Sequence, residues 1–248
     1  MSPTRMAHPL PSARPAAAEP PPPTYAVGDL LNGRYRLLDR LGEGGMGTVW
    51  RAHSLSVGRD VAVKLIRSDR ESPEAIARLH VEACAAGALE HPSIVRVFDF
   101  GETTFGDPFL VMELLQGESL ATMIDHGGPM REPRAVAVLL PVASALQAAH
   151  EKGIIHRDIK PDNIFVVPLD LDEGTRLPKI VDFGLARLEA SQRRLTAEGS
   201  VLGSPGYMAP EQAMGEHDVD AQADVWSFCV VLYELVTGLV PFSGANVG

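Results

Sequence analysis

Residues 153–167, GIIHRDIKPDNIFVV, place a polar octet between two apolar runs. The first run is Ile154–Ile155 and the second is residues 164–167, and both are typical of short buried strands. The octet, residues 156–163, carries five ionisable side chains and an asparagine. Because an unpaired buried charge is costly, such an octet beside core strands indicates a site with a chemical role.

The oxygen-bearing side chains of this region are spaced for cation binding. Asp158 and Asn163 share one predicted loop with Lys160 between them, and Asp182 follows a second apolar run in KIVDFGLA. Carboxylate and amide oxygens at the ends of strands can gather around a hard cation such as Mg²⁺. A hydrolase with paired carboxylates is an alternative. A hydrolase would not explain Lys160, Asn163 or the glycine-rich stretch described next.

A glycine-rich stretch, LGEGGMGTV, precedes this region by about a hundred residues. Gly42, Gly44 and Gly47 have G-x-G-x-x-G spacing. In a dinucleotide site these glycines open a helix, whereas here TVWRAHS follows and predicts a strand. No Lys-Ser/Thr pair follows them, which excludes a Walker loop. The stretch therefore predicts a hairpin whose backbone N–H groups can lie over phosphates.

Lys64 interrupts the apolar run VAVKL. A solvent-facing lysine on an edge strand and a cation aimed at phosphate are both consistent with this pattern. The second interpretation needs a carboxylate to hold the lysine. Glu82 is the candidate, because it borders the apolar face of a helix predicted over residues 72–90.

The order of predicted elements divides the chain into three parts. Residues 1–28 hold eight of the 20 prolines and are expected to form a disordered tail. Residues 29–115 predict strands with one helix. Residues 116–248 are expected to form mainly helices. One is predicted over residues 133–153, where Pro141 should kink the helix or remove one of its backbone hydrogen bonds. Another is predicted over residues 223–238 and should be buried, because it is apolar nearly all round. We therefore expect an α+β fold with two lobes.

Composition excludes several classes of protein. The net charge of −10 argues against a nucleic-acid partner. The two cysteines, Cys84 and Cys229, are too few for a disulfide framework or a zinc ligand set, so two buried thiols in a reducing cytoplasm are expected. No apolar stretch is long enough to span a membrane.

Taken in order, these motifs resemble the eukaryotic-type (Hanks-type) protein kinases, most closely the bacterial Ser/Thr kinases. The resemblance runs from about Tyr35 to the end and includes the glycine-rich loop, VAVK, HRDIKPDN, DFG, and GSPGYMAPEQ followed by DVWSFCVVLYELVTG. It implies a bilobal protein-kinase-like fold, with residues 29–115 as the N-lobe and residues 116–248 as the C-lobe. It also implies a serine/threonine protein kinase that uses ATP and Mg²⁺ to phosphorylate proteins.

The resemblance assigns a role to each matched residue. In catalysis, Lys64 holds the α- and β-phosphates and is braced by Glu82, Asp158 accepts or orients the substrate hydroxyl proton, and Lys160 steadies the γ-phosphate. Asn163 and Asp182 hold Mg²⁺. The residues implied to bind the nucleotide are Leu41, Gly42, Glu43, Gly44, Gly45, Met46, Gly47, Val49, Ala62, Lys64, Met112, Glu113, Leu115 and Phe165.

Further family features lie outside the nucleotide site. His156 is expected to pack against Phe183, and Asp224 to tie the helix over residues 223–238 to the catalytic loop. Autophosphorylation is expected at Thr196 or Ser200, with Ser204 nearer the catalytic loop, and self-association for this step stays open.

The chain also departs from the family pattern. The family's helical lobe continues past the position of Gly248, so we expect a C-terminally truncated lobe that lacks the arginine partner of Glu211. Membrane tethering through a later region stays open. Two alternatives follow: a nucleotide-binding pseudokinase or scaffold without turnover, and an interaction module that acts through residues 1–28.

Overall fold

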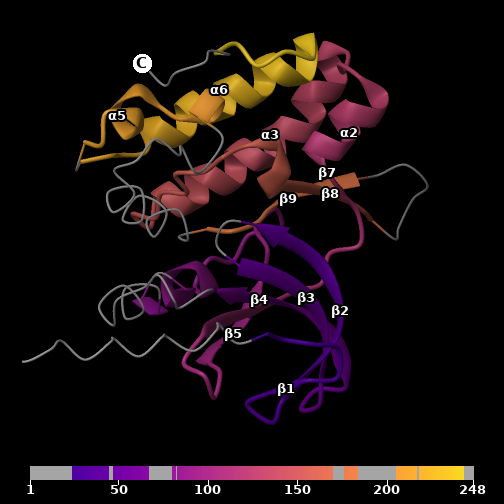
Figure 1. Cartoon of the computed structure of the whole chain (residues 1–248). Helices are drawn as coiled ribbons and strands as arrows, with labels where there is room; N and C mark the ends of the chain where they lie inside the picture. The colour runs from indigo at the N-terminus through magenta and orange to yellow at the C-terminus, as the bar shows by residue number, and fades with distance from the viewer. Residues whose placement is uncertain are drawn as a thin grey trace, which may run out of the picture.

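The protein, seen here as a computed structural model, has a strand-rich part and a helical part that meet near a small second sheet (Figure 1). This arrangement confirms the predicted α+β, two-lobed fold. The chain passes from the first part to the second through residues 113–117. The structure describes residues 24–44, 47–66, 80–81, 83–169, 176–183, 205–216 and 218–242.

Six described strands form the first sheet, in the order β1-β2-β3-β4-β6-β5, with every neighbouring pair antiparallel. Its central strands carry the β-branched and aromatic side chains that suit a half-buried sheet, so Leu37, Trp50, Val63 and Phe109 pack into one core. The strands are β1 (Leu30–Leu31), β2 (Tyr35–Gly44), β3 (Gly47–Ser54), β4 (Arg59–Ile66), β5 (Val97–Glu102) and β6 (Pro108–Met112).

The helix predicted over residues 72–90 is described only in its second half. Residues 80–81 and 83–87 are helical, and Ala83 and Ala86 are buried, as the apolar spacing predicted. Residues 72–79 and Glu82 lie outside the described residues.

The second part combines a three-stranded antiparallel sheet with helices. Strand β8 follows the polar octet and pairs with both its neighbours, β7 and β9. The strands are β7 (Glu118–Ser119), β8 (Ile164–Pro168) and β9 (Arg176–Ile180), and the helices are α2 (Leu120–Gly127), α3 (Glu132–His150), α5 (Pro210–Ala213) and α6 (Gln222–Thr237).

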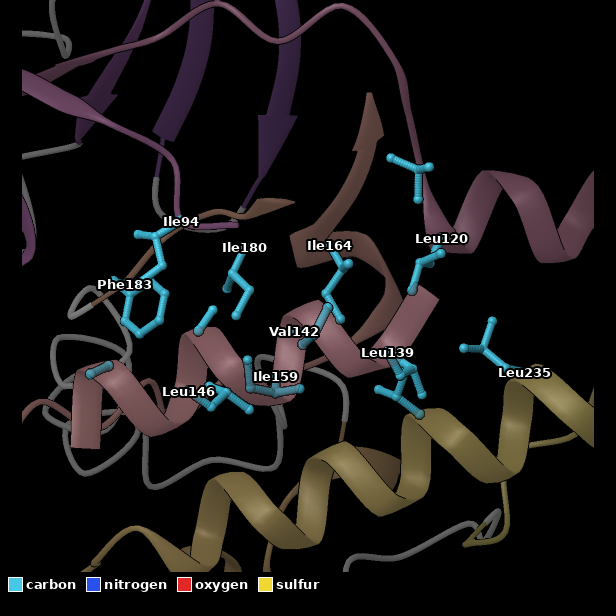
Figure 2. Close-up of a cluster of buried hydrophobic side chains, with 14 of the residues drawn as sticks. Ile94, Leu120, Leu139, Val142, Leu146, Ile159, Ile164, Ile180, Phe183 and Leu235 are labelled. Carbon is cyan, nitrogen blue, oxygen red and sulfur yellow. The ribbon is translucent and has the colours of Figure 1, made fainter. Parts of the chain in front are cut away.

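Helix α3 lies between this small sheet and α6, and it supplies the centre of the largest core (Figure 2). Leu139, Val142 and Leu146 of α3 belong to one buried cluster with Ile164 of β8 and Ile180 of β9. In Figure 2 the two isoleucines lie on the sheet side of α3, whereas Leu139 lies on the side toward α6. Each of these side chains is at most 5% exposed, so its burial stabilises the folded state by roughly 1.5–3 kcal/mol. The polar octet, residues 156–163, is therefore anchored in the core at its C-terminal end, where β8 follows it directly.

Several local expectations need correction. Ile154–Ile155 is half-buried and forms no strand. Helix α6 is not buried all round, because Val225, Cys229 and Tyr233 share an exposed face at four-residue spacing. Cys84 is also exposed, so both thiols lie at the surface.

Helix α3 runs unbroken through Pro141. The missing N–H of proline removes one bond of that helix but does not end it. In the part of the chain that the structure covers, none of the helices is apolar over enough of its length to cross a membrane.

Tyr25 packs against the first sheet and the turn between β5 and β6, although it falls within the segment expected to be a tail. Its hydroxyl donates to Asp107 Oδ2 at 2.6 Å and shares a hydrogen bond with Thr103 Oγ1 at 2.9 Å. Its ring meets Phe105 edge-on. Residues 1–23, which hold the remainder of the predicted tail, lie outside the described residues.

Candidate active site

The carboxylate of Asp158 is fixed by two neighbours on its own loop. Lys160 Nζ lies 2.8 Å from Asp158 Oδ2. Asn163 Nδ2 donates to the same oxygen at 2.9 Å and to the Asp158 backbone carbonyl at 2.8 Å. Because the amide nitrogen makes both bonds, the carbonyl oxygen of Asn163 is the atom that suits a cation.

A second pair joins the two lobes. Lys64 Nζ of β4 lies 2.7 Å from Asp182 Oδ2, just beyond β9 and 118 residues further along the chain. The Lys64 side chain is only 9% exposed, so the interpretation as a solvent-facing lysine is wrong. Asp182 has a φ of 64°, a left-handed conformation that is uncommon for non-glycine residues and concentrates at functional sites.

Backbone bonds bring the loop of Asn163 next to the segment of Asp182. Val181 N donates to Asn163 O at 2.9 Å, and His156 Nε2 lies 2.8 Å from Val181 O. Strands β8 and β9 continue this pairing through Ile164 and Ile180. Asn163 and Asp182 therefore stand on adjacent segments, and their amide and carboxylate oxygens are a donor set that fits Mg²⁺.

The glycine-rich stretch is a hairpin, as predicted. Gly42 pairs with Val49 and Gly44 with Gly47, so strands β2 and β3 continue to its tip. Gly47 has a φ of 150°, and a Cβ there would lie 1.8 Å from the Leu65 carbonyl oxygen, so packing requires glycine.

Packing does not require glycine at the two positions of β2 in this hairpin, Gly42 and Gly44. A Cβ at Gly42 or Gly44 would meet nothing within 4 Å. Close approach of a ligand would account for both. Leu41 and Glu43 beside them are exposed, and Gly45 and Met46 lie outside the described residues.

Three of the residues expected around a nucleotide base, Ala62, Met112 and Leu115, lie in one apolar cluster. Ala62 pairs with Met112 across β4 and β6, and both share an apolar cluster with Leu115 and Val181. Val49 pairs with Lys64 on the next strand, and Phe165 of β8 is half-buried.

Glu113 follows Met112, and its side chain is engaged in hydrogen bonds within the protein. Its carboxylate Oε1 accepts from Arg96 N at 2.8 Å and from Lys179 Nζ at 2.7 Å. Its backbone N–H donates to Arg96 O. The group that Glu113 can offer to a base edge is therefore its carbonyl oxygen.

Asp224 anchors the catalytic loop to α6 from a fully buried position. It accepts hydrogen bonds from the backbone N–H groups of His156 at 2.9 Å and Arg157 at 2.7 Å, and its Oδ2 lies 2.7 Å from His150 Nε2. Burial alone raises the pKa of this carboxyl, but the bond to His150 and the contacts of His156 and Arg157 outweigh it and lower the pKa. His156 also meets Phe183 edge-on at 4.6 Å, as expected.

Replacing Asp224 by asparagine is expected to lower the free energy of unfolding by about 2–3 kcal/mol, because charge-assisted bonds in the core are lost. Since the folded state lowers the pKa of Asp224, the wild-type chain keeps this stability at neutral pH and loses it as the pH falls through the folded-state pKa. Urea unfolding at pH 7 and at acidic pH checks both points. An equal loss at both pH values would contradict the electrostatic explanation.

Three supporting residues were not predicted from the sequence: Lys179, His150 and Gln212. Lys179 had a usable signal, because, like Lys64, it interrupts an apolar run. His150 and Gln212 act through contacts between segments far apart in the sequence, for which a single sequence gives no sign. Thr196, Ser200 and Ser204 lie outside the described residues, and Glu211 is half-buried at the start of α5.

Comparison with known proteins decides the family. A family model described as the protein kinase domain matches residues 35–247. The chain belongs to the protein kinase family. A Ser/Thr kinase of Myxococcus xanthus, Pkn1, is 42% identical to this kinase domain over 212 residues, which cover 85% of this chain and 30% of that protein.

Other similar proteins agree. The Ser/Thr kinase PknB of Mycobacterium leprae is 43% identical over 218 residues, covering 86% of this chain and 34% of that protein. The crystal structure of the Mycobacterium tuberculosis PknI kinase domain has a TM-score of 0.71 and 26% identity, and the match covers 90% of this chain and 82% of that one. This kinase domain thus spans about a third of the length of the curated relatives.

Proposed function

We propose that this kinase domain transfers the γ-phosphate of ATP to serine or threonine hydroxyls of proteins. The observation that carries the proposal is the convergence of two charge pairs, Asp158 with Lys160 and Lys64 with Asp182, beside Asn163. Positioned charges of both signs are what phosphoryl transfer needs, since the enzyme contributes mainly orientation and electrostatic stabilisation.

Each lobe would supply part of the nucleotide site. The backbone of residues 42–47 covers the phosphates, and Lys64 neutralises charge on the α- and β-phosphates. Adenine lies against Val49, Ala62 and Phe165, with its edge bonded to backbone between Glu113 and Leu115. Met112, which is buried beside Ala62, limits the depth of the base site.

In the transfer step, the oxygen of the substrate hydroxyl attacks the γ-phosphorus and the bond to the β–γ bridging oxygen breaks. Asp158 accepts the hydroxyl proton, and Lys160 stabilises the charge on the transferred group. ADP leaves with the bridging oxygen. Asn163 and Asp182 would hold Mg²⁺, which supplies charge neutralisation on the phosphates when bound.

A pseudokinase or scaffold is the second candidate. It is disfavoured because Lys64, Asp158, Asn163 and Asp182 are all present, and every contact described above among them is of hydrogen-bond length. An interaction module that acts through residues 1–28 predicts instead that deleting those residues removes function. Phosphoryl transfer should survive that deletion.

The test is to incubate the chain with radiolabelled Mg·ATP and a generic protein substrate, followed by phosphoamino-acid analysis. We expect label on phosphoserine and phosphothreonine, and self-labelling that mass spectrometry maps to Thr196 or Ser200. Label on tyrosine alone, or nucleotide binding without label, would overturn the proposal. An active enzyme whose residues 182–211 stay unmodified would refute only the autophosphorylation sites.

A further inference from the structure

The peptide unit that leads into Asp158 is held in an unusual conformation. Arg157 has a φ of 69°, in the left-handed region that is unfavourable for a non-glycine residue. Such a conformation persists only where surrounding contacts determine it. Because Asp158 follows directly, these contacts also determine where its carboxylate points.

Among the described residues, the contacts that hold this backbone include three hydrogen bonds. The N–H of Arg157 donates to Asp224 Oδ1 at 2.7 Å. The N–H of Asp158 donates to His156 Nδ1 at 3.2 Å. The carbonyl oxygen of Arg157, at the other end of the same peptide unit, accepts a hydrogen bond of 2.8 Å from Gln212 Nε2.

Gln212 reaches this carbonyl from α5, 55 residues further along the chain. Its own Oε1 accepts from Ala209 N at 3.2 Å at the start of that helix. With both ends of the amide engaged, the donor direction of Nε2 is defined. The turn before α5 is fixed in its place as well, because Ser227 Oγ of α6 donates to Tyr207 O at 2.7 Å.

We infer that Gln212 is a positioning residue for catalysis: it fixes the Arg157–Asp158 peptide unit and so the orientation of the Asp158 carboxylate. This inference rests on the proposed kinase function. Gln212 does not touch the reacting atoms. It links α5 to the catalytic loop, so the placement of this short helix becomes part of the active geometry.

The contact is expected to affect turnover more than nucleotide binding. Lys64 and the glycine-rich hairpin, which would hold ATP, come from the other lobe. Among the described residues, neither forms a hydrogen bond with the Gln212 side chain. Without the Gln212 donor, the Arg157–Asp158 peptide unit loses one of the hydrogen bonds that orient it. Misplacement of the general base lowers the rate of proton transfer.

The first test is Gln212→Met, which keeps the length of the side chain and removes the donor. We expect kcat to fall about ten-fold, as for the loss of one hydrogen bond of about 1.4 kcal/mol, with the KM for ATP within about two-fold of wild type. The matched control is Gln147→Met. Gln147 is exposed on α3 and contacts only Glu151 among the described residues, so wild-type kinetics are expected.

The second test is Gln212→Glu, which gives a readout that loss of packing would not produce. An ionised carboxylate repels the Arg157 carbonyl, whereas the protonated acid donates a hydrogen bond to it. The ratio of wild-type to variant kcat should therefore shrink as the pH is lowered. The same ratio for Gln212→Met should not depend on pH.

Three outcomes would overturn the inference. The first is an unchanged kcat in Gln212→Met while wild type is active. The second is a pH-independent ratio for Gln212→Glu. The third is loss of ATP binding in both variants, because Gln212 would then support folding and not positioning. A wild-type chain that binds ATP without transferring phosphate would instead overturn the proposed function, so the two failures are distinguishable.

Discussion

Replacing Asp158 by asparagine is expected to lower kcat by about a thousand-fold, within the range contributed by a positioned general base. Asparagine has nearly the same shape but cannot accept a proton at neutral pH. It also loses the ion pair with Lys160, which now lies 2.8 Å from the carboxylate. Single-turnover transfer of radiolabelled phosphate measures the effect.

Nucleotide affinity should change little in this variant, because the proposed base and phosphate contacts come mainly from the other lobe. A titration of ATP by calorimetry in both proteins checks this. Asp60→Asn is the matched control, since Asp60 is an exposed residue of β4 that pairs with His53. Retention of more than about a tenth of wild-type turnover would mean that Asp158 is not the base.

Replacing Lys64 by methionine is expected to lower kcat/KM for ATP by roughly a hundred-fold or more, as for the loss of a preorganised charge. The Lys64 side chain is 9% exposed, so its charge acts through little water and is strong. The substitution also leaves Asp182 without the cation 2.7 Å away. Initial rates over a series of ATP concentrations give the value.

Lys152→Met is the control for this variant. Lys152 is exposed beyond α3, and among the described residues its side chain donates to the Ala88 carbonyl alone. Its kinetics should match wild type. If Lys64→Met also matched wild type, the inward-facing lysine would serve structure and the proposed phosphate contact would be wrong.

The sequence predicted the parts of the site that local pattern determines. Strands on both sides of the glycines distinguished a hairpin from a dinucleotide turn, and the register of β2 and β3 confirms it. The apolar run after the octet predicted a buried strand next to Asn163, and β8 with its buried Ile164 confirms it. The run before the octet, Ile154–Ile155, was also predicted to be a strand and is not one.

What the sequence could not predict depends on contacts between distant segments. Nothing near Lys64 selects Asp182 as its partner, and nothing near Gln212 indicates the Arg157 carbonyl. Hydrophobicity alone also misjudged α6, because an apolar side chain such as Val225 can stay at the surface where no described element covers it. These features arise only once the chain is folded.

The central claim is that this chain turns over ATP through the site around Asp158. The most direct measurement is the initial rate of γ-phosphate transfer from Mg·ATP to a Ser/Thr protein substrate, with thermal stability followed in the same samples. We expect steady transfer by wild type and almost none by Asp158→Asn, with ATP raising the melting temperature of both. Equal stabilisation by ATP with no transfer by wild type would contradict the claim and identify a nucleotide-binding pseudokinase.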